Sequence, residues 1–443
     1  MLKARAKLRA NGSRRLAATL FLSTVAVAMP VNAATPAYEP DTPKLKASQL
    51  LPKKTLKGAN HTVQEQVVNR GFMNHYRITS PLGEFSATSD ALVVKRIYEI
   101  AAIAELRKMS KSKVFAEAVG SAVAKPIGTI GKVVDDPEGT VAGISSGVGR
   151  LFKRTVRRTQ DAVEKAKEVA EEEKNKESGQ ATEQGDTSSK ATEQGKKMAR
   201  SYLGVNSAFR KLAMELKVDP YTDNPVLREE LDSMSKVSAA GSFGTKLVMP
   251  SLPVGLDQLA DVGNLVWTMN PLDLQLRNEE SLRKIGADDG LIKRFYKNPH
   301  YTPTTHTRVV ISLEHLAGVK GRPVIVRYAS AMESPAEARF AARLVELLAE
   351  YHKTRARIGQ IVETDRIPFA ITIEGKGVVA APVDYLFWTQ TVSSAANDLL
   401  KAVKRRPPAP EVWVEGRVSK RAQEGLELAG WKVFPRAFTQ VER

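Results

Sequence analysis

The 443-residue sequence contains no cysteine. This absence excludes disulfide bonds, cysteine-ligated zinc, iron–sulfur clusters and a thiol nucleophile. The chain also has neither a P-loop nor a G-x-G-x-x-G pattern, so we expect no nucleotide enzyme and no bound cofactor.

Acidic residues are too few to balance the basic ones. The 67 Lys and Arg against 49 Asp and Glu give a formal net charge of +18, and the sequence pI is about 9.8. A basic surface attracts nucleic acid, anionic lipid or another polyanion. No motif that reads nucleic acid is present, so we expect no nucleic-acid partner.

Long apolar runs are rare as well, and the one near the N-terminus covers residues 16–29. Six basic residues and no acidic one precede this run, and small residues follow it at Ala33 and Ala34. This order is that of a Sec-type signal peptide, with cleavage after Ala33 or Ala34. A membrane anchor is the alternative, but the run is shorter than the roughly 18–20 residues that a spanning helix needs. We therefore expect export to the periplasm or envelope, possible secretion, and no transmembrane helix after removal of the signal.

The composition changes along the chain predict six segments. They are a signal peptide (1–33), a flexible Pro- and Lys-rich tether (34–63), a hairpin with amphipathic helices (64–172), a disordered charged linker (173–196), a helical region (197–302) and an α+β region (303–443). The linker contains Ala-Thr-Glu-Gln-Gly twice and has little to bury. The predicted fold class is α+β and predominantly helical.

Three local patterns are specific enough to place elements. Strand-like residues 74–80 and 84–89 flank a Pro-Leu-Gly turn, which predicts a hairpin. Apolar residues at three- and four-residue steps predict a helix over 90–109 with Ser89 as its N-cap. Residues 412–434 read as strand, helix and strand, the order of a parallel crossover.

A Gly-rich, basic amphipathic helix is the strongest candidate contact surface. Glycines four residues apart leave a helix face on which another backbone or a lipid surface can come close. The adjoining basic residues suit an anionic interface, although close packing inside a domain is the alternative. The apolar part comprises Gly139, Gly143, Gly147, Ile144, Val148, Leu151 and Phe152, and the basic part Arg150, Lys153, Arg154, Arg157 and Arg158.

Catalytic and metal-binding patterns are weak. Ser145 satisfies G-x-S-x-G, but a helix start precedes it where a hydrolase has a buried strand. The six histidines show neither H-E-x-x-H nor a helical pair, so we expect no metal. Asp384 lies in sequence beside Tyr385 and Trp388, where burial would raise the pKa of its carboxyl. These three residues form the candidate ligand site.

Several blocks of the chain resemble a family of exported bacterial proteins, of proteobacterial type, that has no assigned activity. The resemblance is carried by residues 80–85, 96–101, 218–223, 298–303, 318–322, 382–389, 413–419 and 430–433. It covers most of the chain after the signal, and it implies export without implying any chemistry.

The function expected from these patterns is that of a non-enzymatic envelope protein of a Gram-negative bacterium. It would associate peripherally with an anionic membrane surface or an envelope protein through residues 115–158. The alternative is a periplasmic enzyme or small-ligand-binding protein with its site in the C-terminal region.

Overall fold

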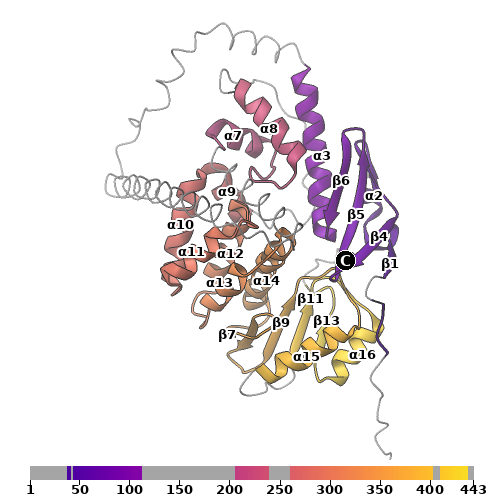
Figure 1. Cartoon of the computed structure of the whole chain (residues 1–443), viewed down its shortest axis with the longest axis vertical. Coiled ribbons are helices and arrows are strands. Elements are labelled where there is room, and N and C mark those ends of the chain that lie inside the picture. The colour runs from indigo at the N-terminus through magenta and orange to yellow at the C-terminus, as the bar shows by residue number, and fades with distance from the viewer. Residues whose placement is uncertain (1–36, 41–42, 112–204, 239–259, 403–409, 438–443) are drawn as a thin grey trace, which may run out of the picture. The chain divides into compact units, whose positions relative to one another are not determined.

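The structure, a computed structural model, describes residues 37–40, 43–111, 205–238, 260–402 and 410–437 (Figure 1). These residues form an α+β protein, as the sequence predicted. The finer prediction of a predominantly helical protein is not confirmed. The described residues also form a six-stranded sheet in their N-terminal part and a five-stranded sheet in their C-terminal part. Within the described ranges, no helix combines the length and apolarity needed to cross a membrane.

The N-terminal sheet is built around its longest strand, β5. This strand pairs antiparallel with β6 along one edge and with β3 and β4 along the other. The pairing with β6 confirms the predicted hairpin. The strands are β1 (Lys44–Lys46), β2 (Lys57–Gly58), β3 (His61–Val63), β4 (Gln66–Arg70), β5 (Met73–Ser80) and β6 (Gly83–Thr88).

The prediction of a flexible tether over 34–63 needs correction. From Lys44 onward this stretch forms β1, β2, β3 and two short helices, α1 (Ala47–Leu50) and α2 (Lys53–Leu56). Strand β1 pairs with β4, which supplies partners for its backbone polar groups. Ala47 and Leu51 are buried in the core beside this sheet. The Lys-rich composition does not indicate this strand, because Lys44 and Lys46 are exposed residues of an edge strand.

Helix α3 (Asp90–Ser110) confirms the helix expected over 90–109. The Ser89 hydroxyl accepts a hydrogen bond from the Leu92 backbone N–H at 3.0 Å, so the predicted N-cap is also confirmed. Val93, Ile100 and Ile103 are fully buried and pack in one core with Tyr76 and with other residues of the sheet. The apolar face of α3 therefore covers the N-terminal sheet.

Helices occupy the middle of the described chain. Their starts follow Asx, Ser or Thr caps and prolines, as at Asn270-Pro271, Thr302-Pro303 and Ser334-Pro335. The helices are α7 (Ser207–Glu215), α8 (Pro225–Ser238), α9 (Ala260–Thr268), α10 (Pro271–Lys284), α11 (Asp289–Lys297), α12 (Pro303–His315), α13 (Pro323–Ser330) and α14 (Pro335–Thr354).

The C-terminal sheet has the strand order β13-β11-β9-β8-β7. Strands β9, β11 and β13 run parallel, and β8 and β7 run antiparallel to their neighbours. The strand–helix–strand unit β11-α16-β13 confirms the predicted parallel crossover. The elements are β7 (Ile358–Val362), β8 (Phe369–Thr372), β9 (Gly377–Ala381), β10 (Tyr385–Leu386), α15 (Gln390–Ala402), β11 (Glu411–Val414), β12 (Arg417–Val418), α16 (Lys420–Leu428) and β13 (Lys432–Phe434).

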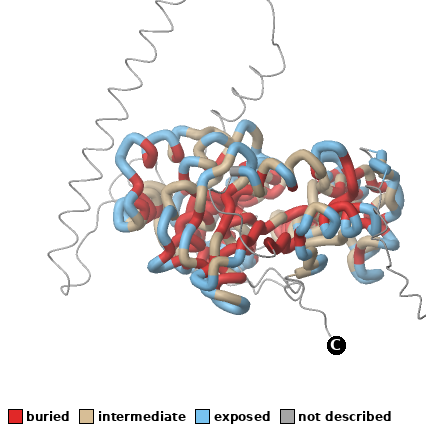
Figure 2. Tube along the Cα trace, turned by 90° about the horizontal axis from the view of Figure 1, so that it is seen from below, coloured by how far each residue is buried: buried red, intermediate tan, exposed pale blue. Residues whose placement is uncertain are grey.

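Both faces of this sheet are buried, which explains its nearly continuous apolar strands. Val378 and Ala380 of β9 belong to the core that contains α14. Val379, between them in sequence, belongs to the core that contains α15 and α16. The alternation has the period of two that a strand imposes. Figure 2 shows the buried segments of the protein in red and the exposed ones in pale blue.

Candidate functional site

Most of the residues predicted to make contacts lie outside the described residues. This applies to the whole Gly-rich and basic set between Gly139 and Arg158, to Ser145, and to Ala33 and Ala34. The contact surface, the linker and the cleavage site therefore stay predictions. Asp384, Tyr385 and Trp388 lie within the described chain.

Asp384 joins the C-terminal unit to the N-terminal sheet. Its Oδ2 accepts a hydrogen bond from the Asn74 backbone N–H at 2.8 Å, and its Oδ1 accepts one from the Asp90 backbone N–H at 3.1 Å. Asp90 begins α3, so Asp384 also supplies an acceptor to the start of that helix. The Asp90 carboxylate accepts from Asn74 Nδ2 at 2.8 Å and from the Tyr76 hydroxyl. Both oxygens of Asp384 are thus engaged by the chain itself.

The two aspartates form a coupled acidic pair. Burial raises the pKa of Asp384 well above its usual value, and the charge of Asp90 raises it further. Burial likewise raises the pKa of Asp90. The pair therefore holds a proton up to a higher pH than an isolated aspartate does. The elevated pKa expected from burial is present, and its cause is a junction inside the fold.

Tyr385 and Trp388 contribute to the same junction. The backbone N–H groups of Asp384 and Tyr385 donate to the Phe72 carbonyl at 3.1 and 3.2 Å. The Trp388 backbone N–H donates to the Glu39 carboxylate at 2.7 Å, and the Trp388 ring is 1% exposed. The segment that contains the three candidate residues thus binds other parts of the chain. Neither of the two cavities considered below is lined by these residues.

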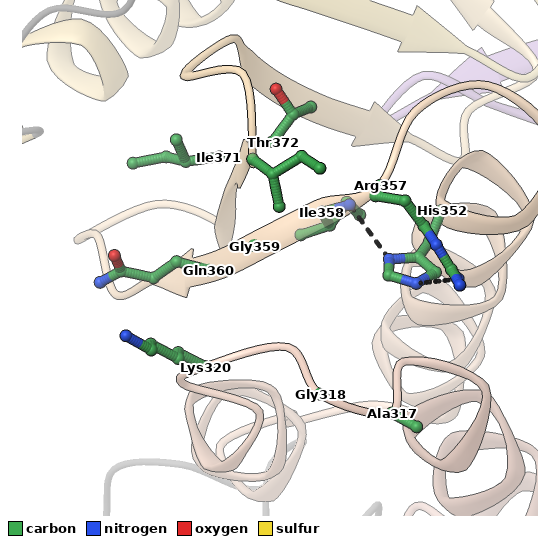
Figure 3. A pocket seen from close by; sticks show the side chains of 11 residues that line it. Ala317, Gly318, Lys320, His352, Arg357, Ile358, Gly359, Gln360, Ile371 and Thr372 are labelled. Atoms are coloured by element: carbon green, nitrogen blue, oxygen red, sulfur yellow. Dashed lines mark hydrogen bonds between the residues drawn. The ribbon is translucent and has the colours of Figure 1, made fainter.

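An open cleft of about 590 Å³ lies at the edge of the C-terminal sheet (Figure 3). Its walls are the loop after α12, the beginning of β7 and the end of β8. Lys320 of the loop pairs with β7: its N–H donates to the Gly359 carbonyl at 3.0 Å, and its carbonyl accepts from the Ile361 N–H at 2.8 Å. This pairing fixes the distance between the two walls.

Gly321 permits this close approach. Its φ of +78° is one that a side chain disfavours, and a Cβ there would lie 2.2 Å from the Ile361 carbonyl oxygen. Gly321, within the 318–322 block, therefore has a structural reason. It lets the Lys320 backbone lie against the sheet edge.

Two hydrogen-bond donors meet in the cleft. The Ile358 backbone N–H donates to His352 Nδ1 at 3.0 Å, and Arg357 Nη1 lies 2.8 Å from His352 Nε2. Burial lowers the pKa of His352, and the charge of Arg357 lowers it further, so the ring is neutral at neutral pH. A neutral imidazole with an accepting Nδ1 carries its proton on Nε2. The Nε2–H and Arg357 Nη1 are then both donors and lie too close for an acceptor to fit between them, so a bound oxygen would pair with the other N–H groups of the guanidinium.

The remaining lining makes the cleft electropositive. Lys320 and Gln360 lie toward one end of it, and His352 and Arg357 lie toward the other (Figure 3). No Asp or Glu is among the residues that line it. The side chains of Lys320 and Arg357 are exposed, so an approaching ligand can reach them.

Sequence reasoning missed this cleft because its basic residues are distant in sequence. Lys320 and Arg357 are brought together only by the pairing of the loop with β7. Among the described residues, no group of three or more histidines and carboxylates is placed to hold a metal ion. Comparison with models of protein families, with curated proteins and with solved structures finds no match.

Proposed function

We propose that this protein is an exported, non-enzymatic binding protein that holds a small oxyanion, a carboxylate or a phosphate, in the cleft beside Arg357. The observation that carries this proposal is the presence of Lys320, His352 and Arg357 in one open cleft whose lining includes no Asp or Glu. This observation favours the alternative function expected from the sequence, that of a small-ligand-binding protein with its site in the C-terminal region. The residues that would bind are not the Asp384 group.

Each basic residue has a separate role in this arrangement. The planar guanidinium of Arg357 presents parallel N–H groups that match two oxygens of a carboxylate or phosphate. His352 lies against the Arg357 guanidinium and positions it, and the His352 ring orientation is held by the Ile358 N–H. Lys320, toward the other end of the cleft, offers a point charge for a second anionic group. The ligand expected to bind best is therefore a small dianion.

Isothermal titration calorimetry tests this with inorganic phosphate and with succinate. Arg357→Gln should weaken binding by roughly tenfold or more, because a hydrogen bond to a charged group contributes about 1.5–3 kcal/mol. The matched control is Lys353→Gln, which removes one positive charge from the exposed last turn of α14. The proposal is wrong if neither anion binds at millimolar concentration, or if both variants weaken binding equally.

A second function concerns residues 115–158, and its basis is the sequence. Five basic residues lie within nine positions, Arg150 to Arg158, next to the Gly-rich repeat. Such a segment would associate peripherally with an anionic membrane surface or with an envelope protein. Changing the five basic residues to Gln should abolish binding to anionic vesicles at low salt. Unchanged binding would contradict this association.

Export through the Sec pathway to the periplasm or envelope completes the proposal. The intact mass of protein recovered from its native host should correspond to cleavage after Ala33 or Ala34. Fractionation should place the protein outside the cytoplasm, and release from membranes by high salt or carbonate would support peripheral attachment. An uncleaved protein in the cytoplasmic fraction would contradict export.

A further inference from the structure

A second, smaller hollow lies among the middle helices. It has a volume of about 110 Å³ and is lined from α10, α11, α12 and the loop that joins the last two. His306 of α12 and Tyr301 of the loop contribute ring surfaces to its wall. It is separate from the cleft beside Arg357, because the two share no lining residue.

The imidazole of His306 lines this hollow and has one nitrogen without a hydrogen-bond partner among the described residues. His306 is 6% exposed, and its Nε2 lies 3.0 Å from the Phe295 carbonyl oxygen. A carbonyl can only accept, so Nε2 carries the proton and Nδ1 has a lone pair. Burial lowers the pKa of His306 to about 4, so the ring is neutral at neutral pH. Among the described residues, no group donates a hydrogen bond to Nδ1.

Neighbouring rings hold the imidazole in this orientation. The Tyr301 ring stacks on it at 4.8 Å between centroids with a 14° tilt, and the Tyr296 ring lies 4.5 Å away. The Phe295 ring meets its edge at 4.6 Å. The carbonyl contact and the packed rings together oppose rotation of the imidazole, so Nδ1 is a fixed acceptor.

Other polar groups of the wall are engaged elsewhere. The Tyr301 hydroxyl donates to the Ala329 carbonyl at 2.9 Å. Asn278 donates to the Thr307 hydroxyl at 2.8 Å and accepts from Arg277 at 3.0 Å. Asn298 donates to the Met332 carbonyl at 2.7 Å. The wall therefore combines the aromatic surface of Tyr296 and Tyr301 with the Nδ1 acceptor of His306.

We propose that this hollow binds a small neutral alcohol, whose hydroxyl donates to His306 Nδ1 and whose carbon atoms contact the tyrosine rings. A donor is required because a neutral imidazole nitrogen without a proton can only accept. Lys297 also lines the hollow, so a neutral ligand is preferred to a cationic one. The volume is below the roughly 150 Å³ of an apolar cavity that admits benzene. The alcohol is therefore smaller than a six-membered ring.

The test compares isopropanol with acetone, which has nearly the same shape and no hydroxyl donor. The protein is labelled with ¹⁵N-histidine, and the ring nitrogens are followed by NMR during each titration. Isopropanol should shift the Nδ1 resonance of His306 in a saturable manner, with several-fold higher affinity than acetone, as expected for one neutral hydrogen bond. The resonances of His352 should stay unchanged, so the outcome is independent of the oxyanion cleft.

Two results would overturn this assignment. One is an Nδ1 resonance that responds equally to the two ligands, which would mean that no hydrogen bond to Nδ1 selects the ligand, or to neither, which would mean that the hollow holds water only. The other is a tautomer with the proton on Nδ1, visible in the same spectra before any ligand is added. The His306→Gln variant identifies that signal by its loss, whereas His300→Gln, which changes a neighbouring histidine that does not line the hollow, should leave the isopropanol affinity unaltered.

Discussion

Replacing Asp384 by alanine should loosen the junction between the C-terminal unit and the N-terminal sheet. The substitution removes the acceptor of two backbone N–H groups, those of Asn74 and Asp90. A buried donor left without a partner costs about 1–3 kcal/mol. For two donors, with water partly replacing the carboxylate, we expect a loss of about 3 kcal/mol.

Amide hydrogen exchange is the suitable assay. A chain with several cores has no single free energy of unfolding, whereas exchange reports each junction amide separately. A loss of about 3 kcal/mol should speed exchange at Asn74 and Asp90 roughly a hundredfold, since each 1.36 kcal/mol is a factor of ten. Amides in the middle helices should be unaffected. The control is Asp365→Ala, which removes an exposed aspartate from a turn.

The same junction should weaken as the pH rises. Because the pKa of Asp384 is raised in the folded protein, the folded state holds its proton more tightly than the unfolded state does. The associated stability is complete below about pH 4, the ordinary pKa of aspartate, and is lost as the pH rises through the elevated value. Asp90→Asn removes the neighbouring charge and should flatten this dependence.

Two outcomes would refute this account of the junction. If exchange at Asn74 and Asp90 is the same in Asp384→Ala as in the wild type, the carboxylate does not hold these amides. If protection, corrected for the intrinsic exchange rate, increases from pH 5 to pH 8, the acidic pair is not destabilised by losing its proton.

Three further predictions concern close packing and buried charge. Gly425→Ala should lower stability by about 1–3 kcal/mol, although alanine normally favours a helix, because its Cβ would lie 2.5 Å from the Trp388 ring; thermal unfolding followed by tryptophan fluorescence measures this. Gly321→Ala should displace the loop from Ile361 and reduce phosphate binding in calorimetry without unfolding the chain. Burial alone would raise the pKa of Asp223, but three basic neighbours lower it to about 2, so its stabilising contribution should disappear between about pH 4 and pH 2. In the Asp223→Asn variant, the stability measured by denaturation should not show this loss across the same pH range.

Each of these predictions has a contrary result. A more stable Gly425→Ala variant would mean that α16 can move away from Trp388. Full phosphate affinity in Gly321→Ala would mean that the loop position does not matter to the cleft. Identical acid denaturation of the wild type and Asp223→Asn would mean that the basic neighbours do not hold the Asp223 carboxylate.

The amino-acid sequence alone determined the elements whose signals are local. The turn at residues 81–83, the Ser89 cap and the strand–helix–strand order of residues 412–434 all depend on neighbours within a few positions. These patterns also sufficed for the α+β class, because helix and strand periods are visible in short windows.

The tertiary structure alone decided what meets across long separations. Lys44–Lys46 became a strand only through pairing with β4, and Asp384 acquired its partners from residues about 300 positions away. The cleft beside Arg357 formed in the same way, through the pairing of Lys320 with Gln360. Backbone pairing and burial bring together side chains that are far apart in the sequence. Neither the composition nor the residue spacing around each side chain indicates such a contact, so sequence analysis could not predict it.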